Sequence, residues 1–183
     1  MKKKIVILGS TGSIGSSTVQ IVKNNLNDFD VIALSTNKNV KKLYQQANQT
    51  KAKNVIINYE KSYLKFKAKF KKKKIRVFKN HIEFKKTLKK KVDYTMCSIS
   101  GLDGLIPTLD AIKYSKTVGI ANKETIICAW NLIEKQLSKN KTKFIPIDSE
   151  HFSIWSLIKN ENKNNIDQIF LTGSGGPFLN KPI

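Results

Sequence analysis

The stretch GSTGSIG, residues 9–15, decides the fold of this chain. A short apolar run over residues 3–8 precedes it, and the residues after it repeat apolar side chains at helical spacing. Glycines allow a tight turn and a close approach to phosphate, while the start of a helix adds free N–H groups and partial positive charge. We therefore expect a βαβ unit that binds the pyrophosphate of a dinucleotide, with hydroxyl donors at Ser10, Thr11 and Ser13. A plain tight turn is the alternative.

Beyond this turn, apolar runs alternate with segments of helical spacing. The expected strands cover residues 3–8, 30–35, 54–58, 75–78, 92–98, 117–120, 143–147 and 167–171. The expected helices cover residues 13–26, 40–49, 102–114, 124–137 and 149–159, with a lysine-rich helix before residue 75 and a short helix after residue 78. This alternation predicts an α/β fold with a doubly wound, mostly parallel Rossmann-type sheet.

The chain is long enough for one full domain and the start of another, at 183 residues. Its composition changes near residue 147, from lysine-rich to acidic. We therefore expect a dinucleotide-binding Rossmann domain over residues 1–147. Residues 148–183 would begin an α/β catalytic domain for metal and substrate, which this chain leaves incomplete.

The end of the second expected strand bears on the choice of cofactor. Sites that prefer NAD usually carry an acid there, which binds the ribose 2′-hydroxyl. This chain has Asn37, Lys38 and Asn39 and no acid. A lysine at that position favours the 2′-phosphate of NADPH, although in so lysine-rich a chain it can also be incidental.

Two carboxylates follow the strand expected to end at residue 147. Asp148 and Glu150 would point the same way if the backbone there is extended. Two such ligands suit Mg²⁺ or Mn²⁺. The alternative is helix capping, in which Ser149 and the two acids stabilise the helix that follows. The spacing leaves both interpretations open.

Two further segments follow expected strands, where ligands bind in open α/β sheets. Residues 172–177, TGSGGP, can form an anion-binding nest with Ser174, or a flexible turn. Residues 121–124, ANKE, place Lys123 beside Glu124. These two can face a ligand or form an ion pair at the start of a helix.

The net charge of +21 raises the alternative of a basic nucleic-acid-binding module. Residues 61–91 carry fourteen lysines, one arginine and one acid. Within them Tyr63, Phe66 and Phe70 recur at helical spacing, so we interpret the lysines as a solvated helix face. We expect no specific nucleic-acid partner.

Cys97 and Cys128 have no metal-binding spacing, and we expect two reduced, mostly buried thiols. The chain has no apolar run of the ~18 residues that a transmembrane helix needs. Its first lysines precede an apolar run too short for a signal peptide. We expect a cytoplasmic protein without a membrane partner.

Taken together, these motifs resemble one family, 1-deoxy-D-xylulose 5-phosphate reductoisomerase. It is the NADPH- and metal-dependent oxidoreductase of the methylerythritol phosphate pathway of isoprene biosynthesis. The motifs that carry the resemblance are ILGSTGSIG at residues 7–15, NKNV at 37–40, ANKE at 121–124, PIDSEH at 146–151 and LTGSGGPF at 171–178. They stand in the family's order along essentially the whole chain. Asn37 departs from the glycine that the family often has there, so cofactor contact at this position is the weaker expectation.

The resemblance implies roles for individual residues. The implied cofactor-binding residues are Thr11, Gly12, Ser13, Ile14, Asn37, Lys38, Asn39, Asn122 and Glu124. The implied substrate-binding residues are Lys123, Ser149, Glu150 and Ser174, and the implied metal ligands are Asp148 and Glu150. Lys123, Asp148 and Glu150 would be catalytic.

The resemblance also implies the reaction. A divalent metal, Mg²⁺ or Mn²⁺, would polarise the oxygens of 1-deoxy-D-xylulose 5-phosphate while its carbon skeleton rearranges. NADPH would then reduce the resulting aldehyde to 2-C-methyl-D-erythritol 4-phosphate.

The family's chains are longer and typically dimeric, and they carry further metal ligands, a lid and a C-terminal helical domain. We therefore expect this chain to fold and bind NADPH but to turn over substrate poorly alone. The enzymatic alternative is another Rossmann reductase of a phosphorylated or acidic substrate, such as a semialdehyde dehydrogenase with a catalytic cysteine.

Overall fold

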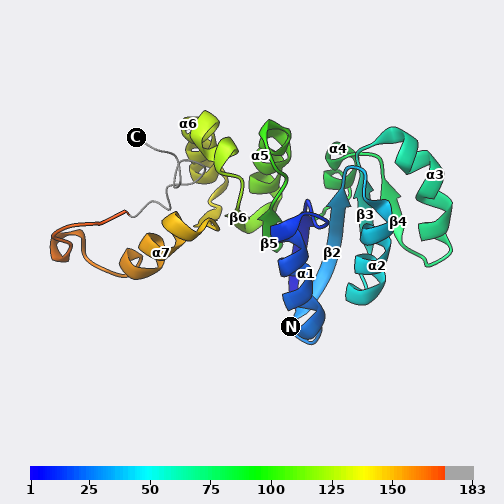
Figure 1. Ribbon diagram of the computed structural model, residues 1–183, viewed down its shortest axis with the longest axis horizontal. Helices are drawn as coiled ribbons and strands as arrows, with labels where there is room; N and C mark the ends of the chain where they lie inside the picture. The colour runs from blue at the N-terminus through cyan, green and yellow to red at the C-terminus, as the bar shows by residue number, and fades with distance from the viewer. Residues whose placement is uncertain (172–183) are drawn as a thin grey trace, which may run out of the picture. The chain divides into compact units, whose positions relative to one another are not determined.

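The computed structural model describes residues 1–171 (Figure 1). The chain divides into two compact units, Met1–Ile145 and Pro146–Ile183. The assignment of a cofactor domain to residues 1–147 and a catalytic domain to residues 148–183 stays a prediction.

A seven-stranded sheet forms the centre of the first unit. Its strands are β1 (Lys3–Leu8), β2 (Phe29–Thr36), β3 (Asn54–Ile57), β4 (Arg76–Phe78), β5 (Val92–Cys97), β6 (Ser115–Ile120) and β7 (Lys143–Pro146). Their order is β4-β3-β2-β1-β5-β6-β7, and β1 to β6 pair in parallel (Figure 1). The chain winds outward from β1 in both directions, so β1 and β5 flank the topological switch point. The predicted doubly wound parallel fold is confirmed.

Helices follow the strands. They are α1 (Ser13–Asn24), α2 (Val40–Thr50), α3 (Glu60–Lys71), α4 (His81–Lys85), α5 (Leu105–Tyr114), α6 (Lys123–Asn140) and α7 (Ser149–Ile158), with 3-10 turns η1 (Leu102–Gly104) and η2 (Lys163–Asn165). Consecutive residues are buried along β1 and β3, as expected when helices cover both faces of a parallel sheet.

The strand expected at residues 167–171 is wrong, because these residues form no strand. Ile169, Phe170 and Leu171 are all exposed. A β-branched and aromatic composition favours a strand only where a neighbouring strand supplies hydrogen-bond partners. Within the part of the chain that the structure describes, nothing pairs with this segment.

The lysine-rich helix α3 has the apolar stripe that its spacing predicts. Phe70 is fully buried and stacks edge-on against Tyr44, with ring centroids 5.3 Å apart. Tyr63 and Phe66 are partly buried, while most lysines of the helix lie on its exposed side. The lysines therefore line the solvated face of an amphipathic helix.

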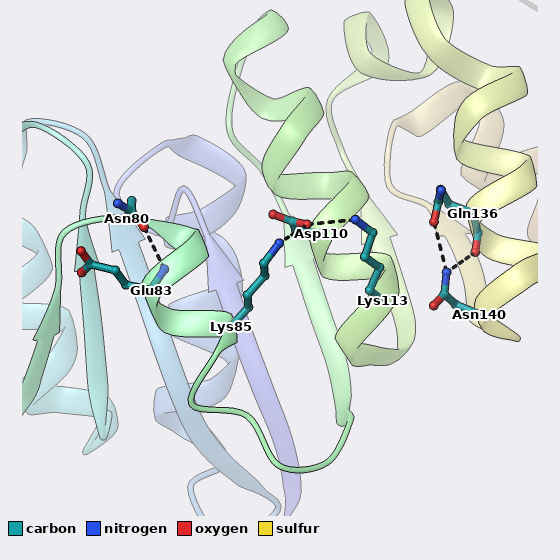
Figure 2. Close-up of polar contacts among 7 residues, drawn as sticks. All are labelled: Asn80, Glu83, Lys85, Asp110, Lys113, Gln136 and Asn140. Atoms are coloured by element: carbon teal, nitrogen blue, oxygen red, sulfur yellow. Dashed lines mark hydrogen bonds and ion pairs between the residues drawn. The ribbon is translucent and has the colours of Figure 1, made fainter.

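Buried Asp110 ties α4 to α5 (Figure 2). Its Oδ1 accepts hydrogen bonds from Nζ of Lys85 at 2.8 Å and from Nζ of Lys113 at 3.2 Å. The Asn80 side chain caps α4 by accepting the Glu83 N–H at 2.8 Å (Figure 2). A buried carboxylate is stable only when it is paired in this way, so these contacts fix the short crossover helix between β4 and β5.

The two cysteines differ in environment. Cys97 is buried, and this burial raises the pKa of its thiol to about 12. Cys128 lies exposed on α6, so the expectation of two buried thiols is wrong for this residue. No helix among the described residues has the length and apolar character needed to cross a membrane.

Candidate functional site

A cavity of about 410 Å³ opens at the carboxyl ends of β1, β2, β3 and β5, beside the switch point. Its walls are formed by Gly9, Thr11, Gly12, Ser35, Thr36, Asn37, Asn58, Ser98, Ile99, Ser100 and Asp103. Three of the expected cofactor-binding residues therefore lie on the wall: Thr11, Gly12 and Asn37.

The three glycines of the β1–α1 turn have different roles. Gly9 has a φ of +76°, and a Cβ there would lie 2.6 Å from the carbonyl oxygen of Ser98. A Cβ at Gly15 would lie 2.2 Å from the carbonyl oxygen of Gly9. A Cβ at Gly12 would meet the protein only at an ordinary 3.4 Å. Gly9 and Gly15 therefore serve the fold, whereas Gly12 leaves room in the cavity.

The N-terminus of α1 has no side-chain cap, because Gly12 is its N-cap residue. The first N–H groups of any helix lack intrahelical acceptors, and they favour an anion. Ser13 and Ile14 are the first two residues of this helix but do not line the cavity. Their contribution to an anion site would come from the backbone.

Hydrogen bonds from α2 and β2 hold the glycine turn in place. Ser10 is fully buried, and its hydroxyl donates to Oε1 of Gln46 at 2.8 Å. The expected donation from Ser10 to a phosphate is therefore wrong. The hydroxyls of Thr11 and Thr36 lie 2.7 Å apart, and Lys42 Nζ donates to the Thr11 carbonyl oxygen at 3.0 Å. The turn is thus preorganised and has an ammonium group beside it.

The three residues that follow β2 make different contacts. Asn37 lines the cavity. The Lys38 ammonium lies 5.6 Å from the centroid of the Tyr59 ring. Asn39 caps α2, with its side-chain oxygen accepting the Lys42 N–H at 3.2 Å. Residues 37–39 therefore carry one ammonium and two amide side chains and no carboxylate.

Asn122 does not line the cavity but holds a loop that does. It is 4% exposed, and its Nδ2 donates to the carbonyl oxygens of Ile99 at 2.5 Å and Gly101 at 2.6 Å. Its Oδ1 caps α6 by accepting the Thr125 N–H at 2.9 Å. Asn122 therefore fixes the loop after β5, in which residues 98–100 line the cavity.

Lys123 and Glu124 lie exposed at the start of α6. No ion pair joins these two side chains. Neither residue lines the cavity. Their expected roles, substrate binding by Lys123 and cofactor binding by Glu124, stay predictions.

Sequence reasoning missed several residues of the wall. Asn58 follows β3, while Ser98, Ser100 and Asp103 follow β5. Their position after a strand could have indicated them, because strands of a parallel sheet end at the same edge, where ligands bind. The alternation of strands and helices in the sequence does not predict the strand order, which places β5 beside β1.

In the second unit, Asp148 caps α7. Its Oδ1 accepts the His151 N–H at 2.9 Å and lies 2.6 Å from His151 Nδ1. Burial alone would raise the pKa of Asp148, but the hydrogen bonds from His151 outweigh burial and lower it. Of the two interpretations that the spacing left open, helix capping is the one observed, because Asp148 is the N-cap residue of α7 and Glu150 lies in its first turn.

The metal-binding roles of Asp148 and Glu150 stay predictions. Within the described residues, no group of three or more His, Cys, Asp or Glu side chains could hold a metal ion. The Ser149 hydroxyl donates to Oε2 of Glu150 at 2.8 Å. Ser174 and the TGSGGP segment, residues 172–177, lie outside the described residues.

Comparison with known proteins decides the family. The family model described as 1-deoxy-D-xylulose 5-phosphate reductoisomerase matches residues 5–130, and the model of its C-terminal domain matches residues 144–183. The chain belongs to the 1-deoxy-D-xylulose 5-phosphate reductoisomerase family. The resemblance read from the motifs is confirmed.

Relatives of the reductoisomerase family match along nearly the whole chain. The Pelagibacter ubique enzyme is 53% identical over 180 residues, covering 97% of this chain and 46% of the relative. The Buchnera aphidicola enzyme is 41% identical over 191 residues, covering 97% and 48%. The chain thus spans about half the length of the curated relatives it matches.

Solved structures of reductoisomerases share the fold. The Zymomonas mobilis enzyme in complex with NADPH has a TM-score of 0.90 at 34% identity, covering 100% of this chain and 48% of that chain. A reductoisomerase in complex with NADPH, fosmidomycin and magnesium has a TM-score of 0.77 at 29% identity, covering 84% and 38%.

Proposed function

We propose that this chain provides the cofactor-binding part, and some of the metal- and substrate-binding part, of a reductoisomerase. The enzyme would convert 1-deoxy-D-xylulose 5-phosphate to 2-C-methyl-D-erythritol 4-phosphate with NADPH and a divalent metal. The observation that carries the proposal is that the two family models match in order along the chain, over residues 5–130 and 144–183. The cavity at the switch point supports it independently.

The cavity has the chemistry that NADPH requires. Gly12 leaves space for a phosphate, and the uncapped start of α1 offers backbone donors. Lys38 does not line the cavity but would offer a cation at the adenosine end, and no acid stands in residues 37–39 after β2. Thr11, Asn37 and Asn39 would complete the contacts, with Ser13 and Ile14 donating from the backbone. Asn122 and Glu124 would serve the nicotinamide end.

The catalytic residues would act from the starts of α6 and α7. Asp148 and Glu150 offer carboxylate oxygens, and one or two carboxylates beside substrate and water suffice for Mg²⁺. When bound, the metal supplies Lewis acidity toward the substrate oxygens and NADPH supplies the hydride. Lys123, Ser149 and Ser174 would bind the substrate.

The substrate would be a small phosphorylated sugar. The relative solved with fosmidomycin and magnesium supports a site for a small ligand in this family. We further propose a cytoplasmic enzyme that is a homodimer at full length. The semialdehyde dehydrogenase alternative is disfavoured at Cys97, because a catalytic thiol needs a lowered pKa and burial raises this one.

A chimera tests the activity. The chain is joined to the second half of the Pelagibacter ubique relative, and NADPH consumption is followed with 1-deoxy-D-xylulose 5-phosphate and Mg²⁺. We expect turnover that Asp148→Asn and Glu150→Gln each abolish, while Glu134→Gln on α6 has no effect. A folded chimera that binds NADPH but is inactive, or activity that survives both substitutions, would contradict the proposal.

A further inference from the structure

Asn58 lies on the wall of the cavity but belongs to none of the motifs that resemble the family. It follows β3 directly, and its backbone N–H donates to the carbonyl oxygen of Thr36 at 3.1 Å. This hydrogen bond continues the pairing of β3 with β2 by one residue. The backbone of Asn58 is therefore fixed beside the end of β2.

The side chain of Asn58 is fixed as well. Its Nδ2 lies 3.0 Å from Nε2 of His81, the first residue of α4. His81 is 7% exposed, and burial lowers its pKa to about 4. The ring is therefore neutral near pH 7, and because an amide nitrogen can only donate, Nε2 accepts the hydrogen bond.

His81 makes one side-chain hydrogen bond within the described part of the chain, the one to Asn58. Its Nδ1 has no hydrogen-bond partner among the described residues. A buried polar atom without a partner costs free energy, so a histidine is a costly residue for this position if packing is its only role. The hydrogen bond to Asn58 is what the imidazole supplies and an apolar side chain would not.

The surroundings of Asn58 indicate which ligand group it faces. Tyr59 is the next residue, and the Lys38 ammonium lies over its ring. Asn37 lines the same cavity. One N–H of the Asn58 amide is held by His81, and the second makes no hydrogen bond within the described part of the chain, so it can donate to a ligand. The Lys38 ammonium and the Asn58 amide donor match a phosphate dianion better than a ribose hydroxyl. The carboxylate of the same wall, Asp103, comes from the η1 turn after β5 and not from the segments after β2 and β3.

We propose that Asn58 is a specificity-determining contact for the 2′-phosphate of NADPH, with His81 as its positioning residue. The inference rests on the proposed function, because it assumes that the cavity binds NADPH. It adds a group from the end of β3 to the site formed after β1 and β2.

Binding of adenosine fragments to the 183-residue chain tests the inference without turnover. The probes are 2′,5′-ADP and 5′-AMP, which differ only in the 2′-phosphate, and calorimetry gives both dissociation constants. Asn58→Asp replaces the donor by a carboxylate. We expect it to weaken 2′,5′-ADP binding by about tenfold or more and 5′-AMP binding by less than about threefold. Asn27→Asp makes the same charge change at the opposite end of the strands and should change neither constant.

Two variants of His81 separate positioning from packing. His81→Leu removes the acceptor and should lower the preference for 2′,5′-ADP over 5′-AMP. His81→Gln keeps an acceptor and should retain more of this preference. A purely structural role would lower the melting temperature in both variants and leave the ratio of the two constants unchanged.

The possible failures are distinguishable. If wild-type chain binds NADPH and 2′,5′-ADP but Asn58→Asp does not change the ratio, the inference is wrong and the proposed function stands. If folded wild-type chain binds neither NADPH nor 2′,5′-ADP, the proposed cofactor site is wrong, and the inference fails with it.

Discussion

The Lys42 ammonium donates a hydrogen bond to the carbonyl oxygen of Thr11 at 3.0 Å. This contact joins α2 to the glycine turn and leaves a positive charge beside the cavity. The charge is half-buried, so solvent screens it less than it screens the fully exposed lysines of the chain.

We expect Lys42→Met to weaken NADPH binding by about fivefold, because the turn loses both a hydrogen bond and a nearby cation. Lys41→Met is the matched control, since Lys41 is an exposed neighbour on the same helix. Calorimetric titration of both variants measures the effect. Equal affinities in the two variants would show that Lys42 has no role at the site.

Gly12 and Gly15 should respond differently to the same substitution. Gly15→Ala should destabilise the chain by more than about 3 kcal/mol, because its Cβ would overlap the carbonyl oxygen of Gly9. Gly12→Ala should cost at most about 1 kcal/mol of folding free energy, as at other helix N-caps. It should nevertheless lower NADPH affinity, because its Cβ would occupy the cavity. Urea unfolding and NADPH titration test the pair, and a Gly12→Ala variant with unchanged affinity would contradict the assigned role.

Asn122→Asp should destabilise the chain by about 2–4 kcal/mol. The carboxylate can still cap α6, but it would face the carbonyl oxygens of Ile99 and Gly101 without a proton to donate. Asn39→Asp is the matched control, because it makes the same change at the exposed N-cap of α2 and should be nearly neutral. Comparable losses of stability in the two variants would refute this role for Asn122.

The stability of the chain should fall as the pH drops from about 6.5 toward 4. The folded pKa of His81 is about 4, below its ordinary value of 6.5, so in this window the unfolded chain binds a proton that the folded chain does not. Acid therefore lowers the free energy of unfolding. The contribution of His81 to this loss is about 2 kcal/mol between pH 7 and pH 5. His81→Gln removes the group, and its urea-unfolding profile over this range should be flatter by that amount. An unchanged slope would place the His81 pKa near its ordinary value.

Much of the fold could be predicted because its signals are local. The apolar run before Gly9, the helical spacing after it and the alternation along residues 1–145 each depend on neighbours in sequence. The strand expected at residues 167–171 failed because pairing is not local. The burial of Ser10 and the exposure of Cys128 likewise depend on which helix packs where.

The candidate site shows the same limit. Thr11, Gly12 and Asn37 were predicted from motifs that neighbour the first two strands. Asn58 and Asp103 lie far from the glycine turn in sequence, and only the strand order brings them to one cavity. The spacing of Asp148 and Glu150 left two interpretations open, and the capping hydrogen bond to His151 is a detail of geometry.

A calorimetric titration of the 183-residue chain with NADPH and, separately, with NADH tests the proposed cofactor site most directly. We expect a single site per chain that binds NADPH at least about tenfold more tightly than NADH, because a cation and no acid follow β2. A folded chain that binds neither nucleotide, or binds both equally, would contradict it.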